Sequence, residues 1–150
     1  MAFLSSLNIS GSALTAERFR IDVISQNISH SETTMTPNGK PYCRKLVVFQ
    51  ERPLDFRTQL KDAAGKTVKT IPATQGGVRA VQVVDSKEEF VPVYDPTHPH
   101  ANADGYVMMP NVNTLEEQTD FMAATRAYEA NLSVLQVGQT MAMRALDLLK

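Results

Sequence analysis

The chain lacks the features that mark several classes of protein. Only 1 of its 150 residues is cysteine, which excludes an internal disulfide. The cysteine content therefore gives no indication of the redox compartment. Lys and Arg total 15 against 16 Asp and Glu, so the basic excess of a nucleic-acid-binding protein is missing. No apolar run approaches the roughly 18 residues of a membrane-spanning helix. We therefore expect an ordinary globular chain with no nucleic-acid partner.

The first residues also lack the pattern of a secretory signal peptide. MAFLSSLNISGSALTAERF has no basic beginning, and no continuous apolar stretch in it is followed by a small-residue cleavage site. The default expectation is a cytosolic protein, unless the chain leaves the cell by a route that needs no cleaved signal.

Proline is absent from both ends of the chain. All 8 prolines lie between Pro37 and Pro110. Because proline removes a backbone donor and clashes with the preceding helical turn, helices are expected outside this stretch. The sequence thus predicts an N-terminal helix and linker at 1–36, a β-rich middle domain at 37–110 and a C-terminal helix within 111–150. The expected fold class is α+β.

The N-terminal segment predicts a helix over 5–29 that is weak in isolation. Apolar residues recur every seven positions, which places them on one stripe: Leu7, Leu14, Ile21 and Ile28. Between them lie poorer residues, among them Gly11, which costs about 1 kcal/mol relative to alanine inside a helix.

The C-terminal segment predicts a stronger helix, from 114 to 149, with the apolar seam of a coiled coil. Asn113 or Thr114 is expected to cap it, with Glu116 and Glu117 completing a capping box. The seam consists of Phe121, Thr125, Tyr128, Leu132, Leu135, Gln139, Ala142, Leu146 and Leu149. Two such helices pack either on the chain's own middle domain or on other chains, and the pattern leaves both arrangements open.

Short strands and turns are expected in the middle of the chain. Asn38-Gly39 is typical of a turn, and 62–66 is typical of a hairpin tip. Gly76-Gly77 precedes a strand, and Pro92 restricts its own strand to an edge or a bulge. The expected strands are 44–50, 78–84, 89–94 and 106–109.

Few residues in the sequence suggest chemistry. His98 and His100, with Asp95 and Asp104 nearby, form the best candidate metal cluster, but a His-Pro-His run points its rings apart and favours an exposed loop. A calcium loop at 102–105 would need a glutamate six residues after its glycine, where asparagine stands.

Cys43 has no activating base nearby and is interpreted as a structural thiol. Gly-rich phosphate loops, nucleophile elbows and HExxH motifs are missing from the sequence. We therefore expect no enzyme, no cofactor and no metal, and favour a structural or assembly role.

Several runs resemble one bacterial protein family. SALTA at 12–16, followed by Asn27-Ile28, is similar to the N-terminal signature of flagellar rod and hook proteins. YDPTHP at 94–99, ADGYVMMPNVN at 103–113 and RAYEAN at 126–131 resemble the proximal-rod proteins of the flagellar basal body. The motif residues are Asn27, Tyr94, Asp95, Pro96, Asp104, Gly105, Tyr106, Pro110, Asn111, Asn113, Tyr128, Glu129 and Asn131. The family signature usually continues Asn-Ile-Ala-Asn, whereas Ser29 and His30 follow here, a departure at the expected helix end.

The resemblance implies a structural subunit of the proximal rod, in which the long N- and C-terminal helices pack as a coiled-coil-like inner layer and the middle forms a small outer β-rich domain. Such subunits assemble helically with other rod proteins into a hollow shaft that transmits torque and conducts exported subunits. Implied partners are proximal and distal rod proteins, further copies of the chain, the inner-membrane MS ring with its rod adaptor, and the type III export apparatus. The implied place is the basal body, across the periplasm, after export without a cleaved signal.

Assembly is expected to use the two apolar helix faces. The candidate interface residues are Leu7, Leu14, Ile21, Ile28, Phe121, Tyr128, Leu132, Leu135, Leu146 and Leu149. Ordering weak helices costs conformational entropy, which burial against neighbouring subunits offsets. The alternative function is a soluble adaptor or export-associated binding module that docks through its C-terminal helix.

Overall fold

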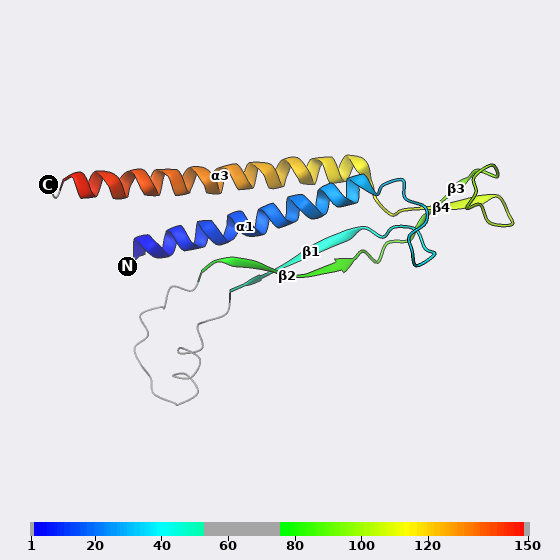
Figure 1. The fold of residues 1–150 in the computed structure, drawn as a ribbon, viewed down its shortest axis with the longest axis horizontal. Coiled ribbons are helices and arrows are strands. Elements are labelled where there is room, and N and C mark those ends of the chain that lie inside the picture. Colours follow the sequence, from blue (N-terminus) through cyan, green and yellow to red (C-terminus); the bar gives the residue numbers. More distant parts are fainter. Residues whose placement is uncertain (1, 53–75, 149–150) are drawn as a thin grey trace, which may run out of the picture.

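The computed structural model describes residues 2–52 and 76–148. Its elements are α1 (Ala2–Ser29), β1 (Lys45–Glu51), β2 (Val78–Asp85), β3 (Val91–Tyr94), β4 (Tyr106–Met109) and α3 (Thr114–Asp147). Figure 1 shows α1 and α3 side by side in opposite directions, with β1 and β2 beneath α1. The expected α+β fold, with terminal helices and small antiparallel sheets between them, is confirmed.

The helix ends follow the local sequence. α1 begins three residues earlier than predicted and ends at Ser29 as expected, where the His30 amide still donates to the Gln26 carbonyl at 3.1 Å. Asn113 caps α3, and its side chain accepts from the Leu115 amide at 3.1 Å. The predicted cap is therefore confirmed. α3 ends at Asp147, so Leu149 of the predicted seam lies outside the described residues.

The described strands form two separate antiparallel hairpins. β1 pairs antiparallel with β2, and the register shifts between Val48 and Phe49, so that Val81 has no partner in the ladder. β3 pairs antiparallel with β4 without irregularity. Both strands of a two-stranded sheet are edges, which accommodates Pro92 as predicted. The predicted hairpin tip at 62–66 lies outside the described residues.

Two predicted loop features are confirmed. Gly39 has a φ of 71°, and its amide donates to the Thr36 carbonyl at 2.8 Å, which closes the expected turn. Gly77 precedes β2 with a φ of 117°.

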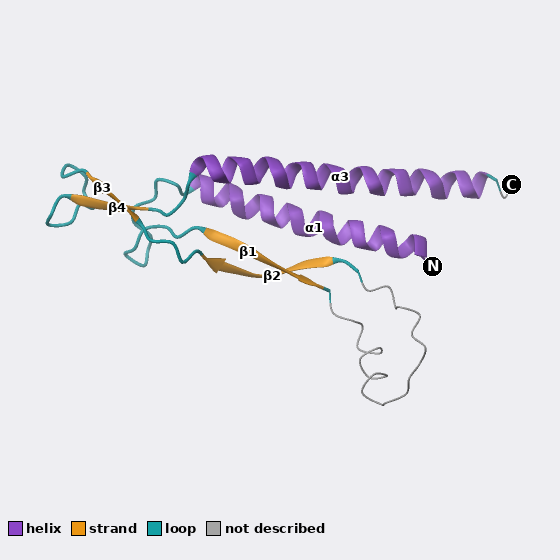
Figure 2. Cartoon of the chain, turned by 180° about the vertical axis from the view of Figure 1, so that it is seen from behind, coloured by secondary structure: helices purple, strands orange, loops and turns teal. Residues whose placement is uncertain are grey.

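The buried core of the described residues is small, and most of it lies around α1. Figure 2 shows the layers from behind: α3, then α1, then the hairpin of β1 and β2, with β3 and β4 extending past the ends of the helices. Because α1 is covered on two sides, its most buried residues are not those of the heptad stripe, whose four members are all half-buried. The buried apolar residues are Ala16, Val23, Ile24, Tyr42, Val107 and Ala124.

Candidate functional site

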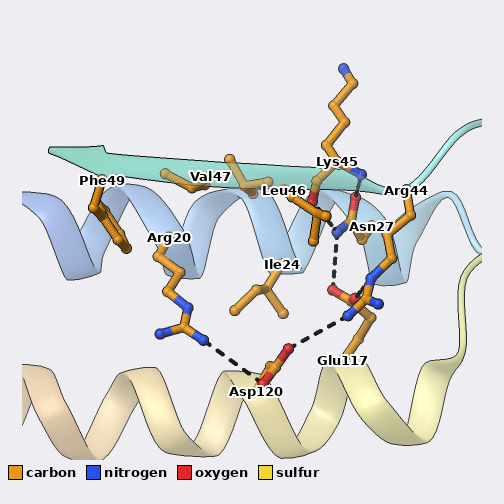
Figure 3. Close-up of a pocket in the computed structure, with 11 residues that line it drawn as sticks. Arg20, Ile24, Asn27, Arg44, Lys45, Leu46, Val47, Phe49, Glu117 and Asp120 are labelled. Carbon is orange, nitrogen blue, oxygen red and sulfur yellow. Dashed lines mark hydrogen bonds and ion pairs between the residues drawn. The ribbon is translucent and has the colours of Figure 1, made fainter. Parts of the chain in front are cut away.

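A buried cluster of polar side chains lies where α1, β1 and α3 meet (Figure 3). We call it the polar joint, and its members are Asn27, Tyr42, Arg44, Asn111 and Glu117. Asn27 and Glu117 are each 1% exposed. Since buried polar groups are costly without partners, the hydrogen bonds of this cluster decide whether it holds the chain together.

Asn27 uses the full bonding capacity of its side chain. Its amide nitrogen donates to the Lys45 carbonyl at 2.9 Å and to Glu117 Oε2 at 3.0 Å. Its oxygen accepts from the Tyr42 hydroxyl at 2.9 Å and from the Lys45 amide at 3.0 Å. An asparagine side chain has two donor hydrogens and one oxygen with two lone pairs, so all four positions are filled. This one residue ties the end of α1 to the start of β1 and to the first turn of α3.

Arg44 supplies the positive charge of the joint. Its Nε donates to Glu117 Oε1 at 2.6 Å, and Nη1 donates to Glu116 Oε1 at 3.1 Å. Nη2 lies 3.5 Å from Asp120 Oδ2. Burial alone would lower the pKa of Arg44, but its bonds to the carboxylates of Glu117 and Glu116 raise it overall. The guanidinium therefore stays charged and bridges three carboxylates on the first turns of α3.

Asn111 completes the joint from the segment that leads into α3. Its oxygen accepts from the Arg44 amide at 2.8 Å, and its nitrogen donates to the Glu88 carbonyl at 2.9 Å. The same nitrogen lies 3.8 Å from Cys43 Sγ. Two asparagines from distant parts of the chain thus bind the amides of consecutive residues, Arg44 and Lys45, where β1 begins.

Tyr42 adds a hydroxyl donor to the joint. Burial, together with the negative charge of Glu117, raises its pKa to about 12. Its ring stacks on His30 with centroids 4.8 Å apart and planes inclined by 22°. The hydroxyl therefore remains protonated and donates to Asn27 over the whole physiological pH range.

A second contact fastens the far end of the hairpin to α1. Ser12 Oγ donates to the Ile9 carbonyl at 2.7 Å and accepts from the Val78 amide at 3.1 Å. A Cβ on Gly77 would lie 2.5 Å from Ser12 Oγ, so only glycine permits this approach. The hairpin of β1 and β2 is therefore held to α1 near both of its ends.

The joint borders an open groove, not a reaction chamber. The groove has a volume of about 300 Å³ and is lined by Ile24, Leu46 and Phe49, with Arg20 and Asp120 3.8 Å apart at its rim. Over residues 2–52 and 76–148, no three His, Cys, Asp or Glu side chains lie close enough to share a metal ion. Within the same residues, no helix is long and apolar enough to cross a membrane. What this arrangement does chemically is bind chain segments together.

The two candidate histidines lie in the loop of the β3–β4 hairpin. Their rings are 5.2 Å apart in an edge-to-face contact, and His100 Nδ1 lies 2.9 Å from Thr34 Oγ1. Asp95 accepts from the Thr97 hydroxyl at 2.6 Å and from its amide at 3.0 Å, which lowers the Asp95 pKa. The Asp95 contacts shape the start of this loop, and the His100 contact joins the loop to the segment that follows α1.

The family-motif residues fall into three groups in the structure. Asn27 and Asn111 belong to the polar joint, and Asn113 caps α3. Six residues shape the β3–β4 hairpin, in which the rings of the two tyrosines lie 5.3 Å apart: Tyr94, Asp95, Pro96, Asp104, Gly105 and Tyr106. Pro110 is buried between β4 and α3, whereas Tyr128, Glu129 and Asn131 lie along α3.

Sequence reasoning missed the central ion pair of the joint. It assigned Glu117 to a capping box and placed Arg44 at the start of a strand. In the structure both carboxylates, of Glu116 and of Glu117, instead accept from Arg44. The partners are 73 residues apart, and a motif search within one element cannot show such a pairing. The only local signal is a charged residue directly before a strand with an apolar centre, Leu46–Phe49.

The candidate interface residues do not gather in one core. Leu7, Leu14, Ile21 and Ile28 on α1 are half-buried, as are Tyr128 and Leu135 on α3. Phe121, Leu132 and Leu146 are exposed. The helix pair thus covers part of both predicted stripes and leaves the remainder open.

Comparisons with known proteins agree with the resemblance. A family model described as "Flagellar basal body rod FlgEFG protein C-terminal" matches residues 103–148. A flagellar basal-body rod protein FlgC of Bacillus subtilis is 39% identical, with 99% of each chain covered. Proteins of the same name from Borreliella burgdorferi and Salmonella typhimurium are 37% and 36% identical, covering 100% and 99% of this chain and 99% and 98% of their own. The chain therefore belongs to the family of flagellar basal-body rod proteins named FlgC.

Proposed function

We propose that the chain is a structural subunit of the flagellar basal-body rod and that α3 packs side by side with helices of neighbouring subunits. Support comes from relatives that match over nearly the whole chain and from apolar sides of α3 that the monomer leaves uncovered. The alternative of an adaptor with a single partner is not favoured by these relatives.

α3 has one side that is covered within the chain. Glu117 and Ala124 are its buried residues, and Asn131 and Leu135 continue the same side in half-buried positions. At about 100° per residue, these positions fall on a single face of the helix. This face packs against α1 (Figure 1).

Two further sides of α3 are apolar and exposed. We call them stripe A, which is Phe121, Leu132 and Leu146, and stripe B, which is Val134, Val137, Met141 and Leu148. The side between them, which is turned away from α1, is mainly polar: its exposed residues are Arg126, Glu129, Ser133, Gln136 and Thr140, with the apolar Leu115 and Met122 near the start of the helix. Exposed apolar stripes of this length mark interaction surfaces rather than ordinary solvent-facing helix.

A helix with this distribution can pack against a copy of itself on either side. Stripe A of one subunit then meets stripe B of the next, which is a heterologous contact that repeats without closing into a dimer. The polar side between the stripes would face the inside of such an array, and α1 with the hairpins would face outward. This arrangement agrees with a hollow shaft.

The finer parts of the proposal rest on the family resemblance. They are a place in the proximal rod, contacts with other rod proteins and with the MS ring and its adaptor, torque transmission across the periplasm, and export through the type III apparatus without a cleaved signal. The division into a helical unit of 1–36 and 111–150 and a middle unit of 37–110 belongs to the same proposal.

Three consecutive residues of α3 provide the test. Leu132 belongs to stripe A and is 39% exposed, Val134 belongs to stripe B and is 55% exposed, and Ser133 lies on the polar side between them. Leu132→Asp and Val134→Asp should each abolish incorporation into purified basal bodies and swimming, because the new charge would be buried between subunits. Ser133→Asp is the matched control and should incorporate normally.

Protein levels and helicity should be unchanged in all three variants, since the positions are exposed in the monomer. Normal rods containing either the Leu132 or the Val134 variant would contradict the proposed packing. If only the Ser133 variant lost its rods, the neighbouring helix would pack on the polar side of α3, which would also contradict the proposal.

A further inference from the structure

The apolar residues of the helix pair do not define by themselves how far α1 is shifted along α3. On α1, Leu and Ile recur every seven residues. On α3 every seventh residue of the seam is again apolar: Phe121, Tyr128, Leu135 and Ala142. A slip of seven residues, about 10 Å along the helix, would therefore replace one apolar contact with another.

The polar joint, in contrast, does not repeat along the helices. One heptad before Asn27 stands Arg20, and one heptad after Glu117 stands Ala124. After a slip of seven residues Ala124 would lie opposite Asn27, and the Glu117 carboxylate would leave both Asn27 and Arg44. Buried donors and acceptors would then lack partners, which makes the slipped arrangement unfavourable.

We infer that the polar joint sets the axial register of α1 against α3, with Arg44 and Glu117 as positioning residues. A buried ion pair adds little net stability compared with apolar residues of similar size, and its best-attested use is to select one register. The joint is suited to this use because Asn27 also binds both backbone groups of Lys45. The same contacts therefore fix the hairpin and the two helices relative to one another.

Moving the carboxylate along α3 tests the inference directly. The double variant Glu117→Leu/Ala124→Glu shifts it by one heptad on the same buried face. If the joint selects register, α3 should slide by seven residues, so that the glutamate at position 124 meets Asn27 and Arg44. Without such a slide the new carboxylate would be buried at a site that is 0% exposed.

Cross-linking of the purified full chain with a short bifunctional thiol reagent reports the register. In a Cys43→Ser background, Ile24→Cys/Asp120→Cys reports the observed register, because these two residues line the same groove between α1 and α3 (Figure 3). Ile24→Cys/Ala127→Cys reports the shifted register, since Ala127 is one heptad beyond Asp120. Each pair is introduced separately, and circular dichroism establishes that the helices are retained.

The unmodified joint should favour the first pair over the second by about tenfold or more, and the relocated variant should reverse this ratio. Glu117→Leu alone should form both cross-links. Glu116→Leu is the matched control and should keep the first register, because it removes the neighbouring, exposed carboxylate.

Three outcomes would overturn the inference. The relocated variant could keep the first register, it could unfold while Glu117→Leu folds, or Glu117→Leu could retain a single register. None of these readouts depends on incorporation into a rod, so failure here leaves the proposed subunit packing intact.

Discussion

Single residues of the polar joint each satisfy several polar groups at once. Asn27 alone satisfies the Lys45 amide, the Lys45 carbonyl and the Tyr42 hydroxyl, and it donates to Glu117. When such a residue is removed, its former partners stay buried without hydrogen bonds, and each lost bond then costs more than it contributed.

Asn27→Ala should lower the free energy of unfolding by about 2–4 kcal/mol, because several buried groups lose their partner at once. Asn8→Ala is the matched control on the same helix. Asn8 is exposed, and its side chain accepts from Arg52 at 3.4 Å, so its loss should cost less than about 0.5 kcal/mol. Urea unfolding of both variants measures the difference. Equal losses would show that Asn27 in the joint contributes no more to stability than an exposed asparagine.

Tyr42 predicts a change of stability at alkaline pH. Its pKa rises from an ordinary value of 10.0 to about 12 in the folded chain, so below pH 10 both states keep the proton. Above pH 10 the unfolded phenol ionises first, and stability is lost as the pH rises through 12. The wild type should lose roughly 2 kcal/mol relative to Tyr42→Phe, which has no phenol to ionise, between pH 9 and pH 12.

Unfolding free energies of the two chains at several alkaline pH values provide the measurement. If the unfolding free energies of the two chains changed equally over this pH interval, the pKa of Tyr42 would not be raised in the folded state.

At the scale of elements, the hairpin of β1 and β2 depends on contacts with α1 at its two ends. The polar joint holds the start of β1, and Ser12 holds the start of β2. A two-stranded hairpin is marginal alone, so these contacts and the apolar face toward α1 make it part of the fold.

Gly77→Ala should weaken the contact between α1 and the end of the hairpin at which β2 begins. The residue has a φ of 117°, and the new Cβ would lie 2.5 Å from Ser12 Oγ and 3.2 Å from Ser12 Cβ. We expect a loss of about 1–3 kcal/mol in the free energy of unfolding and faster hydrogen exchange in β2.

Gly11→Ala is the opposite case on α1. Gly11 is inside the helix, and a Cβ there meets nothing within 4 Å. Because alanine is the better helix former, this change should stabilise the chain by about 0.5–1 kcal/mol in thermal unfolding. Destabilisation would contradict the free space found around this position.

The whole molecule is elongated, and its exposed apolar surface increases toward the end of α3. Every described side chain from 143 to 148 is exposed, whereas Ala124 is fully buried. Most helical stability comes from packing of an apolar face, and no described part of the chain covers this end of α3.

Hydrogen exchange should therefore distinguish the two parts of α3. In the free chain, amides after Ala142 should exchange at least about tenfold faster than those around Ala124. In purified basal bodies the difference should shrink, because neighbouring subunits cover the exposed stripes. Unchanged exchange in the assembled rod would contradict burial of this end.

Local sequence was sufficient for most of the elements. The helix limits followed from the confinement of proline to the middle and from the Asn113 cap, and the strands began and ended within two residues of prediction. The turn at Asn38-Gly39 was also predictable, because it depends on neighbouring residues only. The covered face of α1 was not predictable in this way. The heptad pattern describes packing against one helix, whereas the hairpin of β1 and β2 packs on a second side of α1.

The amino-acid sequence alone thus determined where helices and strands form, because capping, turn geometry and proline exclusion act over a few residues. Only the tertiary structure decided which faces are covered and which polar groups meet. Arg44 and Glu117 lie 73 residues apart, and their pairing requires two helices and a strand to converge at one point. The same convergence leaves stripes A and B of α3 uncovered, because within residues 2–52 and 76–148 α1 is the only helix that packs against α3.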